Sequence, residues 1–162
     1  MGRLGFALVL LTLLSGCASK PPAGRIFPTT GELTELNVLT APVGLDFNGR
    51  PGLDGFSMKV YGNIANSPKP VPIRSGQIDI LMFDGTLYGR TNLPAALRRW
   101  TFTAEQLRDH EFTARIGTGY EFNLEWETNK PTRQIISVGA RYTSPTGAIL
   151  TSSLSSVTVI DH

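Results

Sequence analysis

The stretch Tyr120-Glu121-Phe122-Asn123-Leu124-Glu125-Trp126-Glu127 decides the fold class of this chain. Large apolar side chains alternate with acidic or amide side chains over eight residues. Because successive side chains of a β-strand point to opposite faces, this spacing predicts a strand with one buried and one solvated side. Glu121, Glu125 and Glu127 then share a face, and we interpret them as solvated surface groups rather than as a hydrolytic pair.

The same two-residue period recurs on both sides of this stretch. We expect further strands at residues 36–39, 56–64, 77–83, 99–103, 112–116, 136–142 and 148–160, the last with a bulge near Ser155-Ser156. Asp84-Gly85 is typical of a two-residue hairpin. The 17 Gly and 11 Pro residues favour many turns. The sequence therefore predicts an all-β protein, with residues 32–162 forming an antiparallel β-sandwich.

One short helix interrupts the strands. Thr103-Ala104-Glu105-Gln106 fits a capping box, in which the Thr hydroxyl and the Gln side chain each bind a backbone N–H of the other residue. We expect a short helix that ends near His110.

The strand at residues 77–83 is apolar on both faces. Two hypotheses account for the second face. Either Leu93 and Leu97 of the following loop cover it, which we favour, or it contacts a partner.

The chain begins with a basic head, Met1-Gly2-Arg3, and an uncharged apolar run from Leu4 to Leu14. A membrane-spanning helix needs about 20 apolar residues, so this run of 11 is too short to be a permanent span. A positive head followed by a short apolar segment and small residues predicts a secretory signal peptide at residues 1–16.

The segment Leu14-Ser15-Gly16-Cys17 resembles the lipobox of bacterial lipoproteins. The resemblance covers residues 1–17 and implies cleavage between Gly16 and Cys17. It also implies a diacylglycerol on the Cys17 thiol, an acylated amino terminus, and a bacterial envelope location. Ala18 and Ser19 follow the cysteine, where an Asp often marks inner-membrane retention, so the resemblance favours the outer membrane. Since Cys17 is the one cysteine of the chain, a lipidated thiol excludes disulfides and thiol catalysis.

Residues 17–31 read as a tether between the lipidated cysteine and the domain. Pro21, Pro22 and Pro28 oppose regular structure, and at about 3.1 Å per residue an extended proline-rich segment would hold the domain roughly 40 Å from the lipid.

The closing segment, IISVGARYTSPTGAILTSSLSSVTVI (residues 135–160), resembles the last hairpin of bacterial immunoglobulin-like and fibronectin III-like modules. The immunoglobulin Cys…Trp…Cys spacing is missing from this sequence, so a sandwich of different topology stays open. The chain is also similar in general character to bacterial envelope lipoproteins, a resemblance that implies no activity.

The residue inventory contains little that points to catalysis. With 15 Lys and Arg against 13 Asp and Glu, the chain is close to neutral and is not expected to bind nucleic acid. His110 and His162 have no metal-ligand spacing, and the serines at 152–156 lie in a predicted strand without a nucleophile-elbow motif. We expect no enzyme activity, no cofactor and no catalytic or metal-binding residue.

One loop carries a weak cation-binding alternative. Asp46, Asn48 and Asp54 lie in a Gly-rich segment that faintly resembles calcium loops, but Arg50 stands where an oxygen ligand would be needed. We interpret the segment as a turn-rich connection. The leading hypothesis is a non-catalytic, lipid-anchored lipoprotein whose β-sandwich binds or supports other envelope components. The alternative is a lipoprotein that binds a small molecule or glycan through loops at one sandwich end, around residues 46–54.

Overall fold

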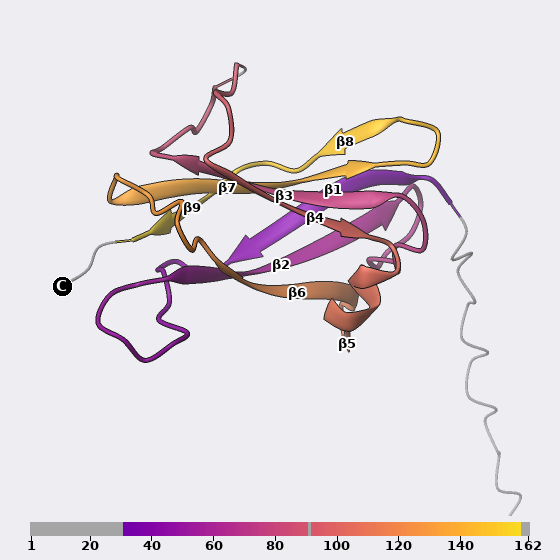
Figure 1. Ribbon diagram of the computed structural model, residues 1–162. Coiled ribbons are helices and arrows are strands. Elements are labelled where there is room, and N and C mark those ends of the chain that lie inside the picture. The colour runs from indigo at the N-terminus through magenta and orange to yellow at the C-terminus, as the bar shows by residue number, and fades with distance from the viewer. Residues whose placement is uncertain (1–30, 91, 160–162) are drawn as a thin grey trace, which may run out of the picture.

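The computed structural model describes residues 31–90 and 92–159 (Figure 1). Over these residues the chain forms nine strands and one five-residue 3-10 helix. In chain order they are β1 (Leu33–Thr40), β2 (Gly55–Ile64), β3 (Gln77–Asp84), β4 (Arg98–Thr103), η1 (Gln106–His110), β5 (Glu111–Ala114), β6 (Gly117–Glu125), β7 (Ile135–Thr143), β8 (Ile149–Thr151) and β9 (Ser155–Thr158).

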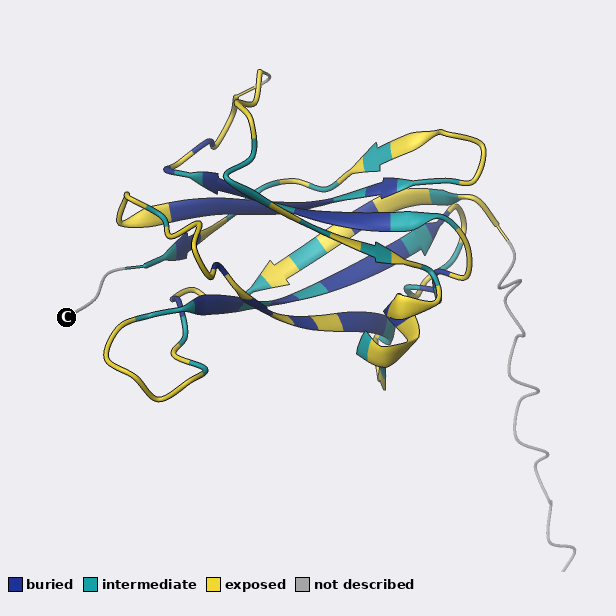
Figure 2. Cartoon of the chain, in the orientation of Figure 1, coloured by how far each residue is buried: buried dark blue, intermediate teal, exposed yellow. Residues whose placement is uncertain are grey.

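The strands pair into two antiparallel sheets that pack face to face. Sheet A has the order β1-β2-β6-β5, and sheet B has the order β4-β3-β7-β8, with β9 also paired to β7. The predicted all-β, antiparallel sandwich is confirmed. Figure 2 shows the buried residues concentrated on the strands between the two layers, while the connecting loops are largely exposed.

The core lies where the inner faces of the sheets meet. Sheet A contributes the apolar residues whose two-residue spacing predicted its strands, and sheet B contributes Ile78, Ile80 and Met82 from its central strand β3. Sheet A supplies Leu36, Phe56, Met58, Val60, Tyr120, Phe122 and Leu124, and β7 adds Ile136, Val138, Ala140 and Tyr142. Burial of these apolar surfaces, at about 25 cal/mol per Å², is the main term that stabilises the sandwich.

Tyr61 departs from the simple alternation. It lies on the outer face of sheet A, opposite Asn37, and is nevertheless buried. Gly119 has no side chain, so the Tyr61 ring lies over that position and contacts Phe112 edge to face, with centroids 5.9 Å apart. Because Gly119 of β6 has no side chain, the Tyr61 ring from the neighbouring strand β2 can pack at that position.

The two reciprocal hydrogen bonds of the predicted capping box are present, but the N-cap of the helix is Glu105 rather than Thr103, which ends β4. The Thr103 backbone N–H donates to Gln106 Oε1 at 2.9 Å, and the Gln106 N–H donates to Thr103 Oγ1 at 3.3 Å. The helix that follows is a single 3-10 segment, with Leu107 buried beneath it and His110 at its end.

The two-residue hairpin predicted at Asp84-Gly85 is wrong. β3 does end at Asp84, but the chain then forms a loop over residues 85–97 before returning as β4, whose pairing starts at Met82 opposite Arg98. The carboxylate of Asp84 accepts hydrogen bonds from Thr132 and Arg133 instead of closing a turn. A long-range contact therefore overrides the local turn preference.

The prediction that Leu93 and Leu97 cover the second apolar face of β3 is wrong, because Leu93 is 45% exposed and Leu97 packs against the core between the sheets. The start of the loop at residues 85–97 lies against that face instead, and Leu87 is its buried side chain. The Leu87 N–H donates to Ser137 Oγ at 2.9 Å, and the Ser137 hydroxyl donates to the Gly85 carbonyl at 2.8 Å. Ser137 lies opposite Phe83 on the outer face of sheet B, so these bonds hold the start of the loop against that face.

The last strand is broken rather than continuous. β8 and β9 both pair with β7, and residues 152–154 lie between them, just before the predicted bulge position. After β1, the chain leaves sheet A and pairs in parallel with β9 at Val43 opposite Thr158. The first and last strands of the described chain thereby join the two sheets along one side of the sandwich.

Candidate functional site

The lipidation site predicted at Cys17, the cleavage position after Gly16 and nearly all of the predicted tether lie outside the described residues. Of the tether, Gly31 is described, and it lies at one end of the sandwich, next to the start of β1. Within the described part of the chain, no helix has the length and apolar character needed to cross a membrane.

The structure brings the three predicted loop residues Asp46, Asn48 and Asp54 into one turn-rich connection between β1 and β2. Asp46 Oδ1 accepts the N–H groups of Asn48 and Gly49, at 3.0 and 2.7 Å. Asn48 Oδ1 accepts the Arg50 N–H at 2.8 Å, and Asp54 Oδ1 accepts the Phe47 N–H at 2.9 Å. The bonds of Asp46 and Asn48 are typical of Asx turns, whereas that of Asp54 joins the two ends of the loop. All three side chains thus bind the backbone of their own loop.

Among the described residues, no three His, Cys, Asp or Glu side chains gather as a metal site would require. Calcium takes six to eight oxygen ligands, and three of the loop's side-chain oxygens already accept backbone N–H groups. The calcium alternative gains no support from this geometry.

A hollow of about 240 Å³ lies beneath this loop, at the end of the sandwich where β6 finishes. Arg50, Asp54, Trp126 and Lys130 contribute to its wall. Two of its wall residues have a buried polar atom without a hydrogen-bond partner, namely the carboxylate oxygen Oδ2 of Asp54 and the indole nitrogen Nε1 of Trp126.

Arg98 links the two sheets beside this hollow. From β4 of sheet B, its guanidinium donates to the Trp126 carbonyl at 2.8 Å and pairs with Glu127 Oε1 at 2.9 Å. The same guanidinium lies over the Trp100 ring, 5.0 Å from its centroid, which is a cation–π distance. Glu127 adopts a left-handed φ of 47° at this point. Glu127 is exposed like Glu121 and Glu125, as predicted, and it also forms an ion pair across the edge of the sandwich.

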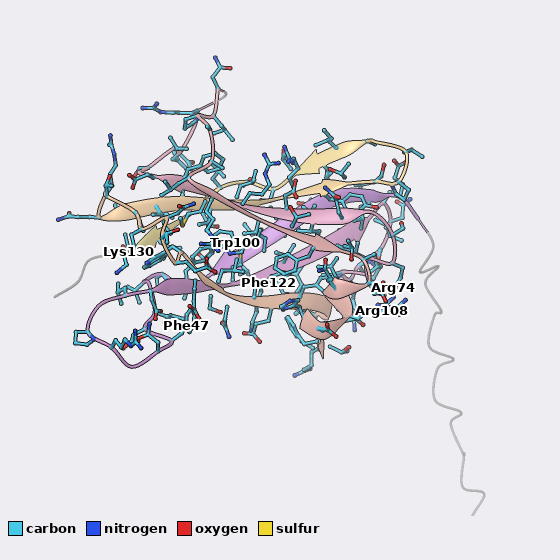
Figure 3. The ribbon with its side chains drawn as sticks, viewed as in Figure 1. Phe47, Arg74, Trp100, Arg108, Phe122 and Lys130 are labelled. Atoms are coloured by element: carbon cyan, nitrogen blue, oxygen red, sulfur yellow. The ribbon has the colours of Figure 1, made fainter. Side chains whose placement is uncertain are left out.

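The opposite end of the sandwich has a second polar cluster, shown by Arg74 and Arg108 in Figure 3. Arg74 forms a two-pronged ion pair with Glu111, and this hydrogen-bonded partner raises the pKa of Arg74 despite partial burial. The buried Tyr120 hydroxyl lies 3.5 Å from Glu111 Oε2. A hollow of about 410 Å³ adjoins Arg74 and also Gly31, where the described chain begins.

His110 has a packing role. Its ring lies between Phe102 and Phe122, with centroid distances of 5.0 and 4.6 Å, and its Nδ1 is 3.0 Å from the Glu121 carbonyl. The ring thus fills the edge between the two sheets near η1. His162, the other histidine considered from the sequence, lies outside the described residues.

The loop at residues 85–97 carries a surface feature that the sequence reading missed. Tyr88 is 90% exposed, and Leu93 is 45% exposed. Together with Leu87, Arg90 and Leu154 they line a hollow of about 490 Å³ on the outer side of sheet B. Figure 1 shows this loop projecting away from the sheet. The signal was an aromatic residue between Gly85 and Gly89, in a segment assigned to a hairpin strand.

Comparison of the chain with protein-family models gives no match, and comparison with curated proteins gives no significant match either.

Proposed function

We propose that this chain is a bacterial envelope lipoprotein, anchored in a membrane through acylated Cys17 and acting by binding rather than by catalysis. The observation that carries the proposal is the segment Leu14-Ser15-Gly16-Cys17 at the end of a short apolar run. A basic head, an apolar run and small residues before a cysteine agree in order and spacing with a lipoprotein signal. Two or three acyl chains, at about 0.8 kcal/mol per buried CH₂, hold a protein firmly on a bilayer.

The folded domain is compatible with a role outside the cytoplasm. It begins at residue 33, and Gly31 lies at one end of the sandwich, so a preceding segment would reach the domain at that end. The loops at residues 41–54, 85–97 and 126–134 belong to the other end and would face away from the membrane. We infer attachment to the outer membrane, because Ala18 and Ser19 follow the cysteine instead of an Asp.

We further infer that the sandwich is an immunoglobulin-like module. The strand order supports this inference, because β1-β2-β6-β5 facing β4-β3-β7-β8 corresponds to the A-B-E-D and C′-C-F-G sheets of that architecture. Such modules present loops and sheet faces to partners, and a binding or supporting role among envelope components follows from that. The contacts of the titratable groups agree with a binding role: Glu111 is paired with Arg74, Asp79 with Arg141, and His110 is packed between aromatic rings.

The anchor is tested by replacing its cysteine. We expect Cys17→Ser to abolish metabolic labelling with palmitate and to leave an uncleaved precursor in the cell. Ser15→Ala is the matched control, because it keeps a small residue two positions before Cys17 and should be labelled and processed like the wild type. Normal processing of Cys17→Ser would contradict the proposal.

A second candidate function is the binding of a glycan or another hydroxyl-rich small molecule in the hollow beneath residues 45–54. It is favoured by the lining of this hollow, in which the polar residues Arg50, Asp54 and Lys130 accompany the aromatic residue Trp126. A thermal-shift screen with simple sugars, with and without Ca²⁺, tests this candidate, since a ligand at 100 times its Kd stabilises the fold by about 2.7 kcal/mol. The shift should disappear in Asp54→Ala and persist in Asp46→Ala. If no sugar raises the melting temperature of the wild type, this candidate is excluded for the sugars tested.

A further inference from the structure

The outer faces of the two sheets carry charges of opposite sign. On sheet A, the register puts Glu35, Glu121 and Glu125 on the outer face, where all three are exposed. One cation, Lys59, shares this face and lies 3.4 Å from Glu121. Over its described residues, the outer face of sheet A is therefore acidic.

The outer face of sheet B carries arginines. Arg99 lies there opposite Leu81, and Arg141 lies there opposite Asp79. Arg90 adds a third cation from the loop at residues 85–97. Among the described strand residues of this face, one carries a carboxylate, namely Asp79. Its side chain is 2% exposed and is bound by Arg141 and by the Thr101 hydroxyl. The exposed charge on the outer face of sheet B is therefore positive.

The two faces also differ in shape. On the side of sheet B, Tyr88 projects from its loop with a 90% exposed side chain. On sheet A, a hollow of about 180 Å³ lies beside Leu39, Ser57 and Lys59, and Leu39 is 58% exposed. An exposed aromatic residue on one face and an apolar-edged hollow on the other are complementary features, of the kind that joins identical molecules head to tail.

We propose that the outer face of sheet B docks on the outer face of sheet A of a second copy of this chain, with Tyr88 of one copy entering the hollow beside Leu39 of the next. Charge selects this arrangement over a symmetric one, because pairing two sheet B faces would oppose arginine to arginine and pairing two sheet A faces would oppose carboxylate to carboxylate. The contact is heterologous and does not close on itself, so copies add in a row.

All copies in such a row could be anchored in the same membrane. A copy displaced along the direction that stacks the sheets keeps its orientation, so the start of β1 lies at the same end of every copy. All amino-terminal segments would then reach one membrane. This compatibility rests on the proposed lipid anchor, whereas the contact between the two faces does not.

Cysteine crosslinking in intact cells tests the contact. In the full chain, Leu39→Cys combined with Tyr88→Cys should give a ladder of disulfide-linked oligomers after mild oxidation, on a non-reducing gel. Each single variant should give none, because its cysteines lie on one face only. A dimer from either single variant would indicate a symmetric contact and overturn the proposal, and so would the lack of a ladder from the double variant. The wild-type chain is the control for crosslinking through Cys17. A disulfide-linked dimer of the wild type would show that Cys17 is not acylated, whereas a failed contact would show as a missing ladder in the double variant.

Charge reversal then tests the chemistry of the contact in the double-cysteine background. Arg90→Glu with Arg99→Glu should reduce the ladder at least tenfold, and Glu121→Arg with Glu125→Arg should do the same. Combining all four reversals should restore it, because the faces are again opposite in sign. Lys130→Glu is the matched control, since Lys130 is exposed and belongs to neither face. A ladder that is unchanged by either pair of reversals, or that is not restored by the combination, would overturn the assignment of the faces.

Discussion

The Ile73 backbone N–H donates to the phenolic oxygen of Tyr120 at 2.6 Å, across 47 residues of sequence. Tyr120 lies on β6 in sheet A, and Ile73 lies in the connection that carries the chain from sheet A to sheet B. The bond therefore fixes the crossing between the layers at a buried point, where no solvent replaces it. Burial also raises the pKa of the Tyr120 hydroxyl, which stays protonated and completes its bonding toward the Ile73 carbonyl and Glu111.

Removal of this hydroxyl should destabilise the fold. We expect Tyr120→Phe to lower the free energy of unfolding by about 1–3 kcal/mol, because the buried Ile73 N–H loses its acceptor. Urea denaturation measures the change. Tyr61→Phe is the matched control, since its hydroxyl has no hydrogen-bond partner among the described residues, and its loss should stay within about 0.5 kcal/mol. Equal effects of the two variants would contradict the structural role of the bond.

Asp84 should make stability depend on pH in the acid range. Partial burial alone would raise the pKa of Asp84, but hydrogen bonds from Thr132 and Arg133 outweigh it and bring the pKa below its ordinary value. A lowered folded-state pKa gives stability that is present above the unfolded value, about 3.9, and is lost as the pH falls through the folded value.

We therefore expect Asp84→Asn to be less stable than the wild type at pH 7 and equally stable once the wild-type carboxylate is protonated. Urea midpoints at several pH values between 7 and 2 measure this convergence. Asp109→Asn, at an exposed position in η1, is the matched control and should stay within about 0.5 kcal/mol of the wild type at pH 7. A stability gap for Asp84→Asn that is the same at every pH would contradict this account.

Two glycines separate the effect of space from that of backbone conformation. A methyl group at Gly55 would collide with the Leu124 carbonyl and the Phe47 ring, whereas at Gly49 it would meet open space but a left-handed φ of 68°. We expect Gly55→Ala to cost about 3 kcal/mol through overpacking, and Gly49→Ala about 1 kcal/mol through backbone strain. Thermal or urea unfolding ranks the two, and the reverse order would show that the close approach at Gly55 is not needed.

Trp126 should contribute strongly to stability. Its side chain is 2% exposed, and we expect Trp126→Ala to cost about 3–5 kcal/mol in urea denaturation. Tyr88→Ala removes another aromatic side chain, but one that is 90% exposed, and should cost less than about 0.5 kcal/mol in the monomer. If Trp126→Ala lost less than about 1 kcal/mol, the inward orientation of this residue would be wrong.

Much of the fold could be predicted because strand periodicity is local. The alternation at residues 120–126 places Phe122, Leu124 and Trp126 in the core, as expected, and the predicted hydrogen bonds between Thr103 and Gln106 form just before η1. The Asp84-Gly85 hairpin failed because Asp84 bonds residues 48 and 49 positions away, a contact that no local pattern contains.

The candidate sites were harder to predict than the strands. The oxygens of Asp46, Asn48 and Asp54 suggested a ligand by spacing alone, but in the fold each accepts backbone N–H groups nearby. Conversely, Tyr88 had no motif that distinguished it from a strand residue. Its exposure follows from the bonds of Ser137, which hold Gly85 and Leu87 against the sheet and leave the next residue projecting.

By itself the sequence determined the two-residue alternation, hence the strands and their buried sides, since side-chain direction along a strand depends on neighbouring residues alone. It also carries the segment Leu14-Ser15-Gly16-Cys17, a local pattern on which the proposed lipid anchor rests. The tertiary structure alone decided that Glu121 and Glu125 lie on the outer face of sheet A, and that Arg99 and Arg141 lie on the outer face of sheet B. It also decided that Arg98 reaches Glu127 and that Tyr61 is buried over Gly119. These relationships join residues from different strands, and they exist once strand order and register bring distant segments together.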